Sequence, residues 1–172
     1  MSVFDEIVAA NARFAERRSP QLFPMPPARR LAIVTCMDAR LDTGRAFGIA
    51  EGDAHVIRNA GGRARDALRS LVISQRLLGT RAVAVVHHTD CGMLTFTNPV
   101  LHAKVKHDLG TDASDIDFLP FSSVEQSVRD DVALLESSPL LDPATTIRGF
   151  IYDVRTGLVS EVESQAALSG AR

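Results

Sequence analysis

The stretch that decides the fold of this chain reads Leu31-Ala-Ile-Val-Thr-Cys36 and continues as Met37-Asp38-Ala39-Arg40. Its apolar and β-branched first part predicts a short strand covered on both faces, as strands of parallel sheets are. In extended backbone, side chains two positions apart share a face, so Cys36, Asp38 and Arg40 are expected to converge. Because parallel sheets bind ligands beyond the carboxyl ends of their strands, this polar continuation is a candidate functional site.

Further runs of the same kind alternate with helical patterns along the rest of the chain. Apolar runs predict strands at residues 54–58, 82–86 and 147–154. Amphipathic spacing predicts a helix over residues 65–78, closed by Gly79, and another that Ser122 caps. Residues 94–107 are weakly helical and residues 108–121 predict a loop. Strands separated by such helices predict right-handed crossovers and an α/β fold, a mostly parallel central β-sheet flanked by helices on both faces.

The chain is expected to form a single domain, residues 1–172, because its length suits one hydrophobic core. Within it, residues 1–30 are expected to be an N-terminal helix and an extended arm, and residues 31–172 the α/β core. Ser2 is a suitable N-cap for a helix that ends near Arg18. The prolines at positions 20, 24, 26 and 27 predict an extended connector.

Composition and charge exclude several classes of protein. The net charge is −2, with 19 basic and 21 acidic side chains, so the basic field that binds nucleic acid is missing. The Arg-rich segment from Arg58 to Arg69 is interpreted as mostly a solvated face. No apolar run is long enough to cross a membrane, and the N-terminus lacks the pattern of a secretory signal. We therefore expect a cytoplasmic protein whose 2 cysteines are thiols or metal ligands rather than a disulfide.

Three residues have the chemistry of a catalytic zinc site. His88 and Cys91 follow the third predicted strand in a His-x-x-Cys spacing, and Cys36 ends the first. Two thiolates and one imidazole suit Zn²⁺ and leave one tetrahedral position free. A structural site would need a fourth ligand, for which the remaining candidates are His55, His102 and His107.

Such an ion lowers the pKa of bound water from about 15.7 towards about 7. Asp38, held by Arg40 in a charge-assisted pair, would accept the hydrogen bond that orients this water, and Arg40 would keep the carboxylate off the metal. Glycine permits close approach of backbone, so Gly61 and Gly62 are expected beside the site, and with Gly92 they are candidate pocket residues.

Simpler interpretations compete with each of these assignments. The cysteines could be buried, inert thiols, and the Asp38 and Arg40 pair an ordinary salt bridge. His87 is interpreted as a core or interface histidine, Asp90 as a turn residue and Asp42 as a helix cap.

The residues Cys36-x-Asp38-x-Arg40 and His88-x-x-Cys91-Gly92, with Arg58-Asn-Ala-Gly61 between them, resemble the β-class carbonic anhydrases from about Leu31 to the last strand. The resemblance implies Zn²⁺ on Cys36, His88 and Cys91, and Asp38 with Arg40 as the catalytic dyad. It further implies reversible hydration of CO2 to bicarbonate and a proton by a zinc-bound hydroxide, in a homodimer or a dimer of dimers. Family members differ in whether the aspartate ligates zinc in a resting state.

Two departures from the family pattern bear on substrate and regulation. Ala50 stands where many members carry a glutamine that donates a hydrogen bond to substrate, and the chain has no tryptophan. The second departure predicts that the inhibitory bicarbonate pocket of some members is missing. The first keeps open an alternative small-molecule activity, hydrolysis of carbonyl sulfide at the same zinc site. A third hypothesis is a non-catalytic, zinc-stabilised dimeric interaction domain. His87 and His55 are candidates for carrying the proton away.

Overall fold

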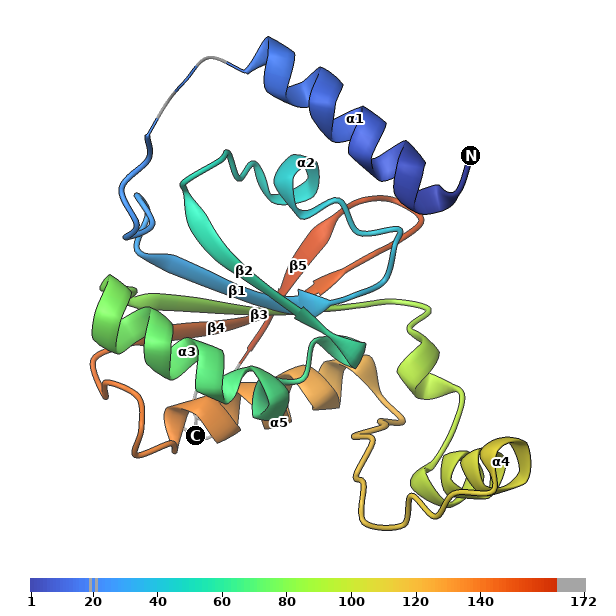
Figure 1. The fold of residues 1–172 in the computed structure, drawn as a ribbon. Helices are drawn as coiled ribbons and strands as arrows, with labels where there is room; N and C mark the ends of the chain where they lie inside the picture. The colour runs from blue at the N-terminus through green and yellow to red at the C-terminus, as the bar shows by residue number, and fades with distance from the viewer. Residues whose placement is uncertain (19, 21, 164–172) are drawn as a thin grey trace.

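The computed structural model describes residues 1–18, 20 and 22–163, and its centre is a five-stranded sheet (Figure 1). The strand order is β2-β1-β3-β4-β5. The strands are β1 (Leu31–Cys36), β2 (Ala54–Asn59), β3 (Ala82–His88), β4 (Thr146–Tyr152) and β5 (Val159–Val162). The first four are parallel, and β5 pairs antiparallel with β4. The prediction of an α/β fold with a mostly parallel sheet is confirmed.

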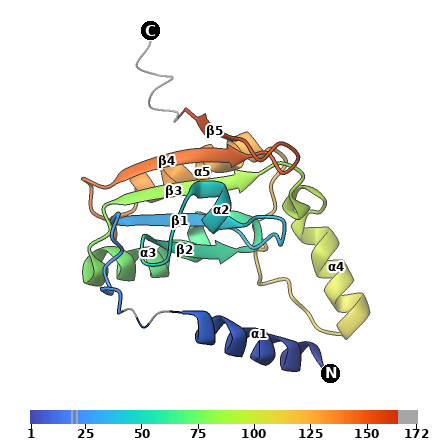
Figure 2. The ribbon, with the colours of Figure 1, turned by 90° about the horizontal axis from the view of Figure 1, so that it is seen from above.

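Helices lie on both faces of the sheet but cover them unequally. The helices are α1 (Val3–Arg17), α2 (Thr43–Phe47), α3 (Ala64–Leu78), α4 (Asn98–Leu109) and α5 (Val124–Glu136). Figure 1 shows α3 and α5 against one face, with α1 and α2 on the other side. Figure 2 shows α1 and α4 standing apart from the sheet. One face therefore carries the core, and the other is only partly covered.

The chain reverses its direction across the sheet after β2, the strand at the edge. From β1 it crosses to β2 by way of α2, and it returns by way of α3 to β3 on the other side of β1. Because parallel crossovers are right-handed, opposite directions of travel place α2 and α3 on opposite faces. The carboxyl ends of β1 and β3 flank this switch point, where such sheets bind ligands.

The core fills the space between the sheet and the helices α3 and α5. It consists of buried apolar side chains of β1, β3, α3, α5 and the following loop: Ala32, Val34, Val83, Val85, Ala64, Ala67, Leu71, Val128, Val132, Leu135 and Leu141. Gly149 of β4 lets α5 approach, because a Cβ there would lie 2.4 Å from Val128 Cγ1.

Two of the predicted helix caps are confirmed and one is wrong. Ser2 caps α1 as expected, its side chain accepting a hydrogen bond from Asp5 N. Asp42 caps α2. The cap of α5 is Ser123 and not Ser122, because the hydroxyl of Ser123 is the one that accepts from Gln126 N, at 3.3 Å.

Apart from its cap at Asp42, the short helix α2 was not expected from the sequence, and neither was β5. Residues 94–107, expected to be weakly helical, begin at the last residue of a 3-10 turn, η2 (Gly92–Leu94), and hold most of α4. Residues 20 and 22–30, the described part of the expected connector, form no helix or strand. Among the described residues, no helix combines the length and apolar character needed to cross a bilayer.

Candidate metal centre

The three predicted metal ligands lie together at the switch point of the sheet. Cys36 ends β1 and His88 ends β3, two neighbouring strands, and Cys91 follows in the next turn. Their ligating atoms all lie within 4.8 Å of one another, and the three residues are buried. Both cysteines are free thiols. The parallel pairing of β1 with β3 thus joins segments that are far apart in the sequence.

The orientation of the His88 ring suits a metal ligand. Its Nδ1 lies 2.8 Å from the carbonyl oxygen of Thr89, which can only accept, so Nδ1 carries the hydrogen. Its Nε2 is buried and has no hydrogen-bond partner in the described part of the chain. A buried nitrogen without a partner is costly unless a ligand satisfies it. The backbone of Thr89 therefore plays the part that fixes the ring of a metal-bound histidine.

The two sulfurs are poised to bind a cation. A hydrogen bond from the thiol of Cys91 lowers the pKa of Cys36 to about 4, against the effect of burial. The nearby His88 ring and hydrogen bonds from the backbone of Asp38 and Gly61 act in the same direction. The pKa of Cys91 is raised because its proton is held by Cys36 and because it is buried. A dication at this point would displace that proton, since coordinating thiols are deprotonated.

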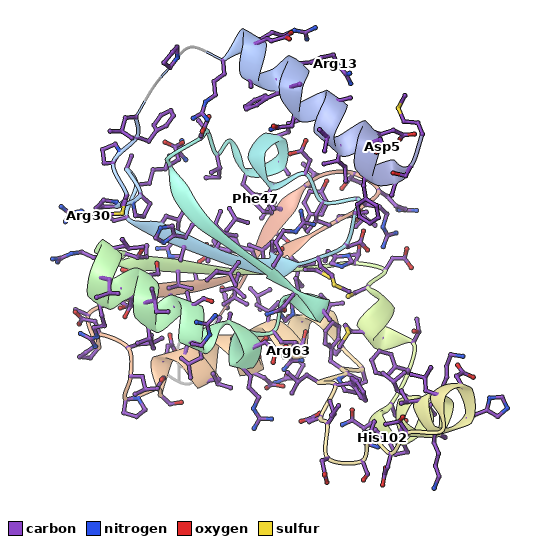
Figure 3. The ribbon with its side chains drawn as sticks, viewed as in Figure 1. Asp5, Arg13, Arg30, Phe47, Arg63 and His102 are labelled. Atoms are coloured by element: carbon purple, nitrogen blue, oxygen red, sulfur yellow. The ribbon has the colours of Figure 1, made fainter. Side chains whose placement is uncertain are left out.

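The chemistry of this donor set fits a borderline-soft divalent ion, so the cluster could hold a metal. The other histidines considered as a fourth ligand lie elsewhere. His55 is in β2 near its amino end, bonded to Ser74 Oγ at 2.7 Å. His102 is on α4, where its Nε2 meets the Ile116 carbonyl, away from the sheet (Figure 3). His107 is on α4 and bonds Asp108.

Asp38 and Arg40 form a bidentate pair beside the cluster. Arg40 Nε donates to Asp38 Oδ1 at 3.0 Å, and Nη2 donates to Oδ2 at 2.8 Å. These bonds hold the pKa of Asp38 well below its usual range. Asp38 Oδ2 lies 3.7 Å from His88 Nε2. An ionised carboxylate therefore stands next to the open side of the candidate ligands, held there by a guanidinium group.

Two residues that the sequence interpretation undervalued support this pair. Arg58, expected on a solvated face, donates from Nε to the Cys36 carbonyl at 3.0 Å and from Nη2 to the Asp38 carbonyl at 2.6 Å. Asp90, expected to be a turn residue, does occupy a turn with φ 54°. Its carboxylate also accepts from Arg40 Nη1 at 2.7 Å. Only the Arg58-Asn-Ala-Gly61 motif pointed to Arg58, and no local pattern pointed to the contact of Asp90.

The glycines beside the site differ in what they do. At Gly62, with φ 71°, a Cβ would meet the carbonyl carbon of Thr35 at 2.9 Å and Cys36 N at 3.0 Å. At Gly61, with φ 78°, it would meet Met93 Cγ at 2.8 Å. At Gly92 a Cβ would have no atom within 4 Å. Close approach therefore requires glycine at positions 61 and 62 but not at position 92.

An apolar cluster surrounds the two sulfurs. It contains Cys36, Cys91 and Met93, and the side chains packed on it are Ala60, Phe96 and Phe121. These apolar side chains provide no charge or hydrogen bond for a charged substrate, so the surroundings suit a small neutral one.

A second buried polar cluster lies behind the site and is not part of it. His87 is fully buried, with Nδ1 2.7 Å from Ser127 Oγ, so its interpretation as a core histidine is confirmed. Asp131 Oδ2 lies 3.2 Å from His87 Nε2 and accepts from Ala64 N at 3.0 Å. Asp131 Oδ1 accepts from Arg63 Nη2 at 3.1 Å, so Arg63 also departs from the expected solvated face (Figure 3). Neither His87 nor His55 is placed to pass protons from the site to solvent.

Comparison with known proteins agrees with this geometry. The carbonic anhydrase family model matches residues 31–113. β-Carbonic anhydrase 1 of Mycobacterium tuberculosis is 45% identical over 165 residues, which are 94% of this chain and 99% of that protein. The carbon disulfide hydrolase of Saccharolobus solfataricus is 33% identical, over 88% of this chain and 85% of the relative.

Solved structures show the same fold. Carbonic anhydrase from Streptococcus mutans superposes with a TM-score of 0.91 at 52% identity, covering 95% of this chain and 99% of the other. Two tetrameric β-carbonic anhydrases come from Sordaria macrospora; the matched chain shares the fold, with a TM-score of 0.68 at 16% identity over 92% of this chain and 96% of that one. At the level of identity found with the mycobacterial enzyme over nearly the full length of both proteins, this chain belongs to the β-carbonic anhydrase family.

Proposed function

We propose that the chain is a zinc-dependent carbonic anhydrase that catalyses reversible hydration of CO2 to bicarbonate and a proton. The observation that carries this proposal is the convergence of the Cys36, His88 and Cys91 ligand atoms within 4.8 Å, with His88 Nε2 left without a hydrogen-bond partner. Zinc, when bound, supplies a Lewis acid that makes water nucleophilic near neutral pH. Membership in the family supports the same reaction.

The chain's own residues would bind the ion, orient the nucleophile and admit the substrate. Cys36, His88 and Cys91 hold the metal and leave one position open. Asp38 stays ionised and accepts the hydrogen bond that directs a lone pair of the nucleophile at the substrate carbon. Arg40 holds Asp38 out of the open position through two hydrogen bonds. The apolar cluster around the sulfurs excludes competing polar groups and suits an uncharged substrate.

Stopped-flow CO2 hydration on purified, zinc-loaded protein tests the proposal, with chelator-treated protein as the control. We expect a zinc-dependent rate that is lost on chelation and restored by zinc. Asp38→Ala is expected to keep its zinc and lose most turnover. Lack of any metal-dependent hydration in a folded, zinc-loaded sample would overturn the assignment, and a fully active Asp38→Ala variant would remove the role given to Asp38.

Hydrolysis of carbonyl sulfide at the same site is the second candidate. It is favoured by relatives that hydrolyse carbon disulfide and share a third of their residues with this chain. It is also favoured by Ala50, whose methyl group cannot donate the hydrogen bond that a glutamine provides. Sulfide release from carbonyl sulfide, measured beside CO2 hydration on one preparation, decides between the two by the ratio of their kcat/KM values.

A non-catalytic zinc-stabilised domain would need Asp38 or another group as a permanent fourth ligand. The bidentate grip of Arg40 on Asp38 favours the catalytic proposal instead. A crystal structure of the zinc form with Asp38 on the metal across the pH range, in a protein without activity, would favour the interaction domain.

We further infer that the chain functions as a homodimer or a dimer of dimers. Helix α1 buries none of its residues and exposes an apolar stripe: Val3, Phe4, Ile7, Val8 and Phe14. The partly covered face of the sheet has a hollow of about 200 Å³, mainly apolar, between α2 and strands β1, β3, β4 and β5. In a symmetric dimer, the apolar stripe of α1 on each chain could cover the apolar face of the sheet on the other chain. The expectation of a cytoplasmic location stays a prediction.

A further inference from the structure

We propose that Asp90 is a positioning residue that locks Arg40 and thereby keeps Asp38 beside the metal and off it. The proposal rests on the proposed function, because it concerns the same dyad. Asp90 is an exposed residue whose place in the turn is explained by its backbone conformation alone, so a role in the reaction is an additional assignment.

The hydrogen bonds of Arg40 divide between two partners. On one edge of the guanidinium, Nε and Nη2 donate to the two carboxylate oxygens of Asp38. On the other, Nη1 donates to Asp90 Oδ2 at 2.7 Å and Nη2 donates to the Asp90 carbonyl at 2.8 Å. Hydrogen bonds on two edges of the planar guanidinium group restrict its rotation about the bonds of the Arg40 side chain. With Asp38 as its only partner, the guanidinium group and the carboxylate could move together.

The position of Asp90 in the chain makes this grip useful. It stands between His88 and Cys91, so the turn that presents two candidate ligands also anchors Arg40. The distance from the dyad to the metal is then set by one rigid turn. The side chain of Arg40 is 47% exposed, so without its second anchor it could swing into solvent. Asp38 Oδ1 would keep only its bond from Arg40 N, at 2.8 Å, and Oδ2, which lies 3.7 Å from His88 Nε2, would be free to enter the open position.

The competing explanation is that aspartate stands at position 90 only because it tolerates a positive φ. Aspartate, asparagine and glycine all adopt φ near 54°, whereas alanine does so at a cost. A set of substitutions separates the two explanations. Asp90→Gly satisfies the backbone but removes the acceptor, Asp90→Asn satisfies the backbone and keeps a neutral acceptor, and Asp90→Ala satisfies neither.

The experiment compares these variants as zinc and cobalt(II) forms of the full chain. If Asp90 positions Arg40, Asp90→Gly keeps the metal and the thermal midpoint but loses about fivefold in kcat/KM, the size expected for an exposed ion pair. Asp90→Asn falls between it and the parent protein. In the cobalt form, Asp90→Gly shifts the visible spectrum as a carboxylate enters the metal's coordination. Asp115→Asn, which removes the same charge from an exposed loop, serves as the control and leaves rate and spectrum unchanged.

A double variant tests the pathway of the effect. Because Asp90 is proposed to act through Asp38, Asp90→Gly should not change the cobalt spectrum of Asp38→Ala. An Asp90→Gly variant with parental rate and parental cobalt spectrum overturns the proposal while leaving the carbonic anhydrase assignment intact. Conversely, a parent protein without CO2 hydration refutes the proposed function, and the cobalt spectra alone still decide whether Asp90 keeps Asp38 off the metal.

Discussion

Metal binding depends most directly on the thiol of Cys36. Its pKa is lowered to about 4, so it is already a thiolate, the form that binds metals, at neutral pH. Cys36→Ser keeps the shape of the side chain but replaces a thiolate with a hydroxyl that stays protonated. We expect the variant to lose stoichiometric zinc, measured as metal per protein by plasma mass spectrometry, and with it the hydration activity. Met37→Leu, at an exposed neighbouring position, is the control and keeps its zinc. Full zinc occupancy in Cys36→Ser would refute the ligand assignment.

The ion pair of Asp38 predicts a pH dependence of stability. Because Arg40 lowers the pKa of Asp38 in the folded protein, the unfolded chain binds the proton more readily, from its ordinary value of 3.8. The stabilisation is therefore complete above about pH 3.8 and is lost as the pH falls through the lower, folded-state pKa. Urea unfolding of the metal-free protein should show Asp38→Asn less stable than the parent at pH 6, with a difference that shrinks below pH 3.8. A difference that is constant with pH would contradict the pairing.

The candidate ligands were predictable because each lies at the end of an apolar strand, and the ends of parallel strands meet. The contacts of Arg58 and Asp90 were not, because they depend on side-chain conformations that bridge separate segments. Asp90 reaches Arg40 across 50 positions, and nothing in the residues around it indicates that distance.

At the scale of the element, the 3-10 turn η1 (Ala60–Gly62) joins β2 to α3 and packs on the strand that carries Cys36. Gly62→Ala places a side chain at a positive φ. Its Cβ would also press on backbone atoms of Thr35 and Cys36, which cannot move aside by changing a rotamer. We expect a loss of about 3 kcal/mol in the free energy of unfolding, of which the left-handed conformation accounts for about 1–2 kcal/mol. Urea denaturation of the metal-free protein measures it, and zinc content should fall too.

Gly79 provides the matched control, since its φ of 73° is nearly that of Gly62 but a Cβ there meets no atom within 4 Å. Gly79→Ala should therefore lose only the conformational part, about 1–2 kcal/mol. Equal losses in the two variants would show that the contact with β1 does not matter.

The elements themselves were predictable to the extent that they bury an apolar pattern. Strands β1 and β3 and helices α3 and α5 have such patterns, and each was expected within a few residues of its bounds. Strand β5 is a short edge strand with mostly exposed side chains, so its sequence lacks the alternation of apolar and polar residues that marks a strand. It is recognised only by its pairing with β4. The error at Ser122 arose because two adjacent serines are equally good caps.

At the scale of the whole molecule, Asp131 of α5 joins three elements that meet behind the site. It accepts hydrogen bonds from Ala64 N at the start of α3 and from Arg63, and it contacts His87 of β3. Asp131→Ala removes the carboxylate that pairs with the largely buried guanidinium of Arg63 and accepts from the amide of Ala64. We expect a loss of about 3–5 kcal/mol in the free energy of unfolding, measured by urea denaturation. Asp130→Ala, an exposed neighbour on the same helix, should change it by less than about 0.5 kcal/mol. A similar small loss at Asp131 would show that the cluster does not join these elements.

The assembly proposed from α1 is tested on the face of that helix. A lone helix with Val3, Phe4 and Ile7 exposed is only marginally stable in water, so its order requires a covering surface. Ile7→Glu places a charge inside the apolar stripe, and light scattering after size exclusion should show a shift from dimer or tetramer towards monomer. Ala12→Glu adds the same charge outside the stripe and should leave the mass unchanged. If Ile7→Glu keeps the parental mass at micromolar concentration, α1 does not bind the second copy; if the parent is itself monomeric, the α1 stripe has no partner of its own kind.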